Sequence, residues 1–226
     1  MALDLSMAML EFAREVEGRR RDDAVAPVER VRGDALRPPF LPASFAEVAL
    51  VGNALGFEER SGEALLDGVE RLVAPGGLLV VEVAPGPGER ANYLARLPPG
   101  AVRRTLAAPP WAVLPRLRRE GFRTEPTRHH GSSFRRWTAE EIIRRWNGSG
   151  WRTREAVAVA PALGPDAERL EEVAKTPRAW ERLLELEEQL GREPARWTHA
   201  AAVLLAGERP LVDANGLVRG APSFSG

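Results

Sequence analysis

A strand, a helix and a second strand follow one another in residues 45–83, and this succession constrains the fold more than any other feature. Residues 45–51 are an apolar run, typical of a strand buried on both faces. Apolar residues then recur at helical spacing from residue 61 until Pro75-Gly76-Gly77, which ends the helix before the strand LLVVEV at 78–83. Strands joined by a crossover helix are parallel, so the chain is predicted to be an α/β protein with a mostly parallel sheet.

Weaker signals extend this alternation in both directions along the chain. Ser6 is a suitable N-cap for a helix with apolar residues on one face, and Thr138 with Glu141 forms a capping box ahead of another. Pro177 occupies the first position of a further helix. The remaining predicted strands are the end of one at residues 1–4, a short β-prone run at 28–32, and runs at 151–159 and 199–206.

The 226 residues are enough for one α/β domain, and we expect it to span residues 1–207. Residues 84–137 interrupt the alternation with glycine and proline, and contain a short helical pattern at 111–119 and the segment RHHGSSFRRW. They are predicted to form an insertion or lid. Residues 208–226 are rich in glycine, proline and serine and are predicted to be a flexible tail.

The composition argues against several classes of protein. There is no cysteine and there are only three histidines, which excludes disulfides and thiol nucleophiles and argues against a metal site. Thirty-two basic and 32 acidic residues balance, so no global field favours nucleic acid or an anionic membrane. No apolar run approaches the roughly 18 residues of a membrane span. A cytoplasmic protein without nucleic-acid or membrane partners is predicted, and a homo-oligomer is left open.

Ligands of parallel sheets bind beyond the carboxyl ends of the strands, so polar residues at those positions are the candidates for a site. Asp4 ends the first strand, and a carboxylate there can accept hydrogen bonds from both hydroxyls of a ribose. Asp34 follows the next strand, where it can accept from an exocyclic amine while the Ala35 amide donates to a ring nitrogen, as adenine would require. The alternative for Asp34 is a simple turn residue.

Three ordered segments carry a resemblance to a known family: ALDLSMAMLEFAR, VRGDALRPPFLPASFAEVALVGNALGF and LLDGVERLVAPGGLLVVEVAPG. They resemble the second, third and fourth strands and the following helix of class I S-adenosylmethionine-dependent methyltransferases, and WTHAAAVLLAGERP is similar to the closing antiparallel strand. The resemblance implies a Rossmann-like, doubly wound, mostly parallel sheet with an antiparallel last strand.

The same resemblance implies a cofactor, S-adenosyl-L-methionine, and residues that bind it. Asp4, with the neighbouring Leu5, would hold the ribose, and Asp34 with Ala35 would hold the adenine. Asn53 follows the fourth strand of the family, close to the reactive methyl group; a loop asparagine is the plain alternative.

The chain also departs from the family pattern. The first strand of the family and its GxGxG loop would precede Asp4, where this sequence has three residues. Since that strand is central in the family's sheet, the fold is expected to be incomplete at the N-terminus, with two interior strands left unpaired.

Two histidines in the predicted lid are candidates for acid–base chemistry. His129 and His130 could act as a general base or bind an acidic substrate, because imidazole titrates near neutral pH. Surface histidines in an arginine-rich loop are the simpler interpretation.

The sequence therefore predicts methyl transfer from S-adenosyl-L-methionine to a small-molecule acceptor. Positioning and desolvation carry most of such a displacement, which fits a chain without a catalytic triad or a metal cluster. One alternative is a methyltransferase-like module that does not catalyse and acts as a partner or scaffold. A nicotinamide-dependent oxidoreductase is the second alternative. Such an enzyme needs a glycine fingerprint after its first strand, and this sequence lacks one.

Overall fold

The structure is a computed structural model that describes residues 1–19, 26–52, 54–56, 62–83, 90–91, 94, 97–119, 122–123, 137–163 and 167–211. Its strands are β1 (Ala2–Asp4), β2 (Arg30–Arg32), β3 (Phe45–Leu50), β4 (Val73–Val83), β5 (Arg90–Ala91), β6 (Phe122–Arg123), β7 (Arg152–Val159) and β8 (Ala202–Glu208). Its α-helices are α1 (Met7–Arg19), α2 (Gly62–Leu72), α3 (Pro99–Leu106), α4 (Pro110–Arg119), α5 (Ala139–Gly148), α6 (Ala167–Ala174) and α7 (Pro177–Gly191). Two short 3-10 helices are η1 (Ala54–Gly56) and η3 (Pro194–His199).

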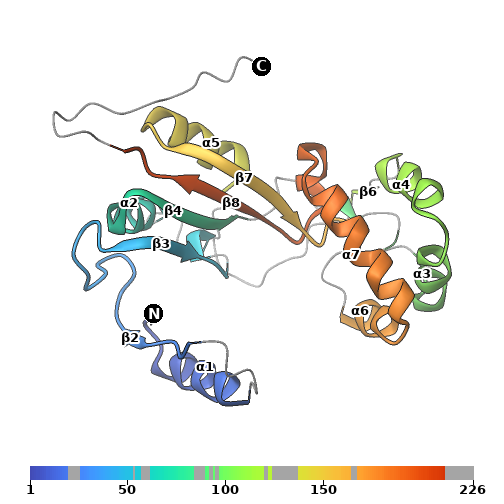
Figure 1. The fold of residues 1–226 in the computed structure, drawn as a ribbon, viewed down its shortest axis with the longest axis horizontal. Helices are drawn as coiled ribbons and strands as arrows, with labels where there is room; N and C mark the ends of the chain where they lie inside the picture. Colours follow the sequence, from blue (N-terminus) through green and yellow to red (C-terminus); the bar gives the residue numbers. More distant parts are fainter. Residues whose placement is uncertain are drawn as a thin grey trace.

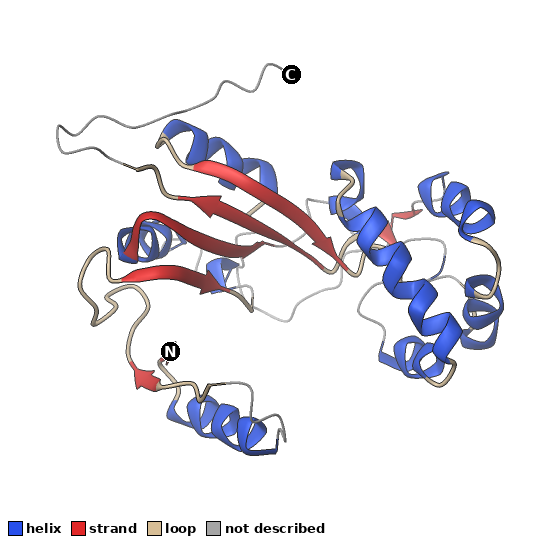
Figure 2. Cartoon of the chain, in the orientation of Figure 1, coloured by secondary structure: helices blue, strands red, loops and turns tan. Residues whose placement is uncertain are grey.

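The main sheet has the strand order β3-β4-β8-β7 (Figure 2). β3 and β4 are parallel, and β8 runs antiparallel to both of its neighbours, β4 and β7. It follows that β3, β4 and β7 all point in one direction and only the last strand of the chain is reversed. The predicted class, an α/β fold with a mostly parallel sheet and an antiparallel last strand, is confirmed.

Local sequence signals place most of the element boundaries. The Thr138 side chain accepts a hydrogen bond from the Glu141 amide at 3.2 Å, and the Glu141 carboxylate accepts one from the Thr138 amide at 2.9 Å, so the predicted capping box opens α5. Pro177 begins α7 as predicted. α2 ends at Leu72, a few residues earlier than the Pro75-Gly76-Gly77 segment predicted to end it, and β4 already includes those residues.

Helices α2 and α5 cover one face of this sheet. Leu79 and Val81 of β4 and Leu205 of β8 are fully buried there, against apolar side chains of both helices. Trp146 of α5 is fully buried over β8, where a Cβ at Gly207 would lie 2.8 Å from its ring. The sheet therefore needs glycine at this position so that the indole can lie against the backbone.

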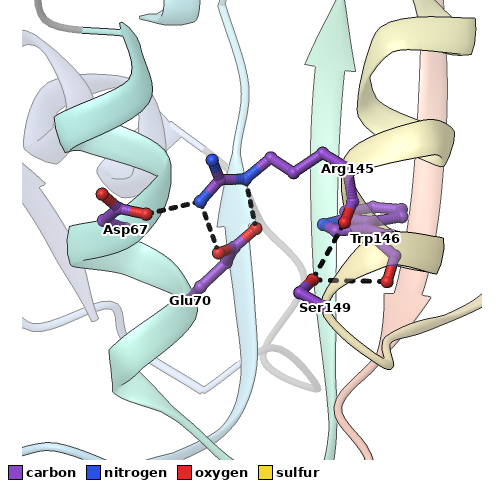
Figure 3. A network of polar contacts seen from close by, with 5 residues as sticks. All are labelled: Asp67, Glu70, Arg145, Trp146 and Ser149. Atoms are coloured by element: carbon purple, nitrogen blue, oxygen red, sulfur yellow. Dashed lines mark hydrogen bonds and ion pairs between the residues drawn. The ribbon is translucent and has the colours of Figure 1, made fainter.

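A charged cluster joins the two covering helices (Figure 3). Arg145 of α5 donates to both carboxylate oxygens of Glu70 on α2, at 3.1 and 2.9 Å, and also to Asp67. The hydrogen bonds to Glu70 raise the pKa of Arg145 above its ordinary value, and burial opposes this shift. Just beyond the helix end, Ser149 donates to the Arg145 and Trp146 carbonyls at 3.0 and 3.3 Å. Charge pairing thus fixes α2 beside α5.

The opposite face of the sheet differs, because its side chains are only partly buried. Val80 and Leu78 of β4 alternate with the buried residues and are half-exposed, as are Leu204 of β8 and Val157 of β7. The prediction that residues 45–51 are buried on both faces is wrong, since Ala46, Glu47, Ala49 and Val51 are exposed. β3 is an edge strand of the main sheet. Within the described residues, no helix covers its face opposite α2.

β1 and β2 form a separate two-stranded parallel sheet on the β3 side of the main sheet (Figure 1). Helix α1 connects them, with Ser6 as N-cap through a 3.3 Å bond from the Met9 amide. The predicted apolar face of α1 exists, but it is not a core face: Met9, Phe12 and Val16 are 54%, 57% and 40% exposed, whereas only Leu10 is buried.

A second hydrophobic core lies beyond the end of the sheet toward which β7 points (Figure 1). α3 and α4, which follow β4, pack there with α6 and α7, which lie between β7 and β8. We call these four helices the helical cap. Leu106, Leu163, Leu183 and Leu186 are among its fully buried residues. Trp180 of α7 is 37% exposed.

One partly buried carboxylate links the cap to the end of β7. Glu187 of α7 accepts hydrogen bonds from the amides of Ala162 and Leu163, just after β7, at 3.0 and 3.1 Å. Burial raises the pKa of Glu187 above its ordinary value, and the two amide bonds oppose the shift. None of the helices in the described segments is long and apolar enough to span a bilayer.

Candidate functional site

The first two strands bring two of the predicted site residues together. β1 and β2 are in parallel register, with Asp4 opposite Arg32, and each strand ends at this pair. The chain continues from Arg32 into Gly33, whose amide donates to the Asp4 carbonyl at 3.0 Å, and then into Asp34. Asp4 and Asp34 therefore lie at neighbouring carboxyl ends of one parallel pair, where ligands of parallel sheets bind.

Both aspartates use one carboxylate oxygen to close a local turn. Oδ1 of Asp4 accepts from the Ser6 amide at 2.7 Å, and Oδ1 of Asp34 accepts from the Leu36 amide at 2.9 Å. These side-chain turns fix the direction of each carboxylate. An ionised carboxylate can accept about four hydrogen bonds, so each group retains acceptor capacity for a ligand. Acting as a turn residue and binding a ligand are thus compatible for Asp34.

Leu5 and Ala35, which were also predicted to bind the cofactor, directly follow the two aspartates in the sequence. The Leu5 side chain is 63% exposed, and its carbonyl oxygen accepts from the Arg32 guanidinium at 3.3 Å, which links the two strand ends again. Ala35 is half-buried and packs against the main core. The carbonyl oxygen of Ala35 would lie 3.5 Å from a Cβ at Gly68 of α2, so the segment after Asp34 is anchored on the body of the protein.

A third acidic side chain, which was not predicted from the sequence, lies at the carboxyl end of the main sheet. Glu82 of β4 accepts a hydrogen bond from the Gly52 amide at 2.9 Å, just after β3. Gly52 has a φ of +75°, which favours glycine and turns the chain away from β3. The signal for Glu82 was present in the sequence, as the one charge inside the apolar run LLVVEV.

The remaining predicted residues, Asn53, His129 and His130, lie outside the described residues, and their roles stay predictions. In the part of the chain that the structure describes, no three His, Cys, Asp or Glu side chains come together as a metal site would require.

The helical cap stands at the same end of the main sheet as Gly52 and Glu82. Its helices leave the sheet after Val83 and after Val159, the carboxyl ends of β4 and β7, and return through η3 to the start of the reversed strand β8. The chain thus supplies acidic groups at strand ends and an adjacent helical layer, which is the general plan of a small-molecule site in an α/β protein.

Comparison with protein-family models and with curated proteins gives no match to this chain. Solved structures to which it is similar include S-adenosylmethionine-dependent methyltransferases. One from Mesorhizobium loti is 18% identical to this chain, with a TM-score of 0.46. The match covers 92% of this chain and 78% of the Mesorhizobium loti protein. Another, from Methanosarcina mazei, is 12% identical, with a TM-score of 0.48. The match covers 92% of this chain and 81% of the Methanosarcina mazei protein.

The cyclase SpnF is also similar, at 15% identity and a TM-score of 0.45. The match covers 92% of this chain and 65% of SpnF, so this chain spans less than two thirds of that protein. At these identities and TM-scores the similarities say nothing about what this chain binds or transforms. Its fold is defined instead by its own strand order and directions.

Proposed function

We propose that this chain binds the adenosine part of S-adenosyl-L-methionine at the ends of β1 and β2 and serves methyl transfer to a small-molecule acceptor. The observation that carries the proposal is the placement of Asp4 and Asp34 at neighbouring strand ends, each with one oxygen already held in a turn. The class I methyltransferase resemblance of the sequence supports the same two residues for ribose and adenine.

The described residues fit the adenosine part of the cofactor in their chemistry. A ribose offers two neighbouring hydroxyl donors, and an adenine offers an amine donor beside a ring-nitrogen acceptor. Asp4 supplies acceptors for the first, while the Asp34 carboxylate and the Ala35 amide supply an acceptor and a donor for the second. Because their turns are already closed, little ordering is needed on binding.

When bound, S-adenosyl-L-methionine would supply a methyl group on its sulfonium sulfur: a nucleophile in line with the carbon–sulfur bond would take the methyl group, and the sulfur would leave as a neutral thioether. The chain's part in such a reaction would be to orient the reactants and to exclude water, and we assign this task to the helical cap, which follows the carboxyl ends of β4 and β7. His129 and His130 remain our candidates for accepting the proton of the acceptor, and Asn53 for orienting it.

Calorimetric titration with S-adenosyl-L-methionine tests this proposal. We expect Asp34→Ala to weaken binding by about 1–3 kcal/mol, through loss of a charge-assisted hydrogen bond. The matched control is Glu140→Gln on the exposed side of α5, which should leave the affinity unchanged. Equal affinity of Asp34→Ala and the parent chain would remove Asp34 from the site.

A second candidate function is a non-catalytic methyltransferase-like module that acts as a partner or scaffold. The half-exposed apolar face of the main sheet and the exposed stripe of α1 favour it, since both are surfaces that a binding partner would bury. Calorimetry distinguishes the two candidates, because a scaffold should give no heat with the cofactor at high micromolar concentration.

A further inference from the structure

We propose that Glu82 binds a positively charged nitrogen of the methyl acceptor, so that the acceptor is a small amine. Glu82 is the next-to-last residue of β4, at the carboxyl end of the main sheet. It lies beside the turn that follows β3. Naming the bound amine as the acceptor rests on the proposed function, whereas the cation site is defined by Glu82 and its surroundings alone.

One hydrogen bond fixes the direction of the Glu82 carboxylate. Its Oε2 accepts from the Gly52 amide at 2.9 Å, just beyond the end of the neighbouring parallel strand β3. No described atom would lie within 4 Å of a Cβ on Gly52, so the space beside this bond is open. An ionised carboxylate accepts about four hydrogen bonds, and among the described residues Gly52 supplies the single one that Glu82 receives. Oε1 is therefore available to a ligand.

Glu208 of β8 is a matched carboxylate on the same face of the sheet. Glu82 lies opposite Leu204 and Glu208 lies opposite Leu78, so both glutamates lie on the face away from α2 and α5, and both are partly buried. Glu208 forms an ion pair with Arg154 of β7. Glu82 forms no ion pair with any residue of the described segments. Of the two, only the unpaired glutamate stands at the carboxyl ends of the parallel strands, where ligands bind.

The surroundings of Glu82 leave its charge without a partner from the protein. Glu17 and Glu70, which are also partly buried, each form an ion pair with an arginine. The neighbours of Glu82 in the sheet are Val80 on the same strand and Leu204 opposite, and neither side chain has a donor. Partial burial of an ionised carboxylate costs free energy unless a partner offsets it. A cation from a ligand would offset this cost.

The arrangement fits an ammonium group better than other cations. Magnesium and calcium require several oxygen ligands, and no three acidic or histidine side chains come together in the described segments. A guanidinium binds both oxygens of a carboxylate in parallel, but Oε2 of Glu82 is already engaged by Gly52. An ammonium needs one acceptor from the protein and has further donors for water or for other groups. The free Oε1 supplies that acceptor.

Nuclear magnetic resonance of the labelled full chain tests the site with two probes of equal length, butylamine, which is charged at neutral pH, and butanol, which is not. The Gly52 amide, hydrogen-bonded to Glu82, is the reporter. We expect butylamine to shift this signal and to bind about tenfold or more tightly than butanol, because a charge-assisted hydrogen bond is stronger than a neutral one. Added salt should weaken the binding of butylamine alone.

Two substitutions complete the experiment. Glu82→Gln keeps an oxygen acceptor for the Gly52 amide but removes the charge, so it should abolish the preference for butylamine. Glu208→Gln, the matched control on the same face, should retain it. Equal affinity of the parent chain for the two probes, or a preference that survives in Glu82→Gln, would overturn the cation site.

A separate titration with adenosine distinguishes failure of this site from failure of the proposed function. Adenosine is followed at the amides of Ser6 and Ala35, beside Asp4 and Asp34. Adenosine shifts without a preference for butylamine would overturn the role of Glu82 alone. A preference for butylamine without adenosine shifts would leave Glu82 as a cation site and overturn the adenosine site instead.

Discussion

The two faces of the main sheet carry similar apolar residues but are buried to different extents. Leu79 and Val81 are fully buried beneath α2 and α5, whereas Val80 between them is half-exposed on the other face. The same contrast separates α5, whose Trp146 is fully buried, from α1, whose Phe12 is 57% exposed. Apolar periodicity specifies the element and its face, but burial requires a second layer to pack against that face.

The largest expected effect is a loss of stability on the covered face. Trp146→Ala should lower the free energy of unfolding by about 3–5 kcal/mol, because it leaves a large cavity between α5 and β8. Trp111→Ala on α4, where the side chain is 76% exposed, is the matched control and should change it by less than about 0.5 kcal/mol. Denaturant unfolding measures both changes. Similar losses of stability in the two variants would contradict the difference in burial between Trp146 and Trp111.

Local signals in the sequence predicted the elements of the covered layer well. The capping box of Thr138 and Glu141 and the helix start at Pro177 depend on residues close together in the chain, and both are confirmed. The antiparallel last strand was also predicted, although from the family resemblance rather than from periodicity.

The misses share a physical cause, which is dependence on distant parts of the chain. The exposure of residues 45–51 could not be read from their apolar pattern, because that pattern is the same whether or not a covering layer is present. α3 and α6 are short helices, and they are stabilised by packing between two segments far apart in sequence. In the candidate site, the adjacency of Asp4 and Asp34 followed from the expectation of parallel strands. The hydrogen bond from Gly52 to Glu82 joins residues 30 positions apart in the chain, so no local pattern indicates it.

An intermediate effect is expected at Gly207, where the covered face allows no extra atom. Gly207→Ala should cost about 1–3 kcal/mol, since its Cβ would lie 2.8 Å from the Trp146 ring and force the indole off the sheet. Thermal unfolding of this variant, beside Gly148→Ala in open space at the end of α5, checks the prediction. A Gly207→Ala protein as stable as Gly148→Ala would show that the packing over β8 is looser than described.

A smaller effect that depends on pH is expected where the cap meets the sheet. Burial raises the pKa of Glu187 above its ordinary 4.5, so its contribution to stability is fully present below that pH and is lost as pH rises through the folded-state pKa. Glu187→Gln removes this titration. The free energy of unfolding of the variant, minus that of the parent, should therefore rise as pH increases above 4.5. A difference that stays flat or falls over this range would be the opposite of the expected sign.

The smallest effect is expected on α1. Phe12→Ser should change the free energy of unfolding by no more than about 0.5 kcal/mol, because the ring is already more than half exposed. Denaturant unfolding under the conditions used for Trp146→Ala makes the two values comparable. A loss above about 1 kcal/mol would mean that another surface covers this side of α1 in solution.

The most direct test of the proposed site is nuclear magnetic resonance of the labelled chain titrated with adenosine, the part of the cofactor that the described residues fit. Binding at the ends of β1 and β2 should shift the amide signals of Ala35 and Ser6, next to the two carboxylates, while amides of the helical cap such as Leu183 stay in place. Unmoved signals at Ala35 and Ser6, or shifts confined to other parts of the chain, would contradict an adenosine site between Asp4 and Asp34.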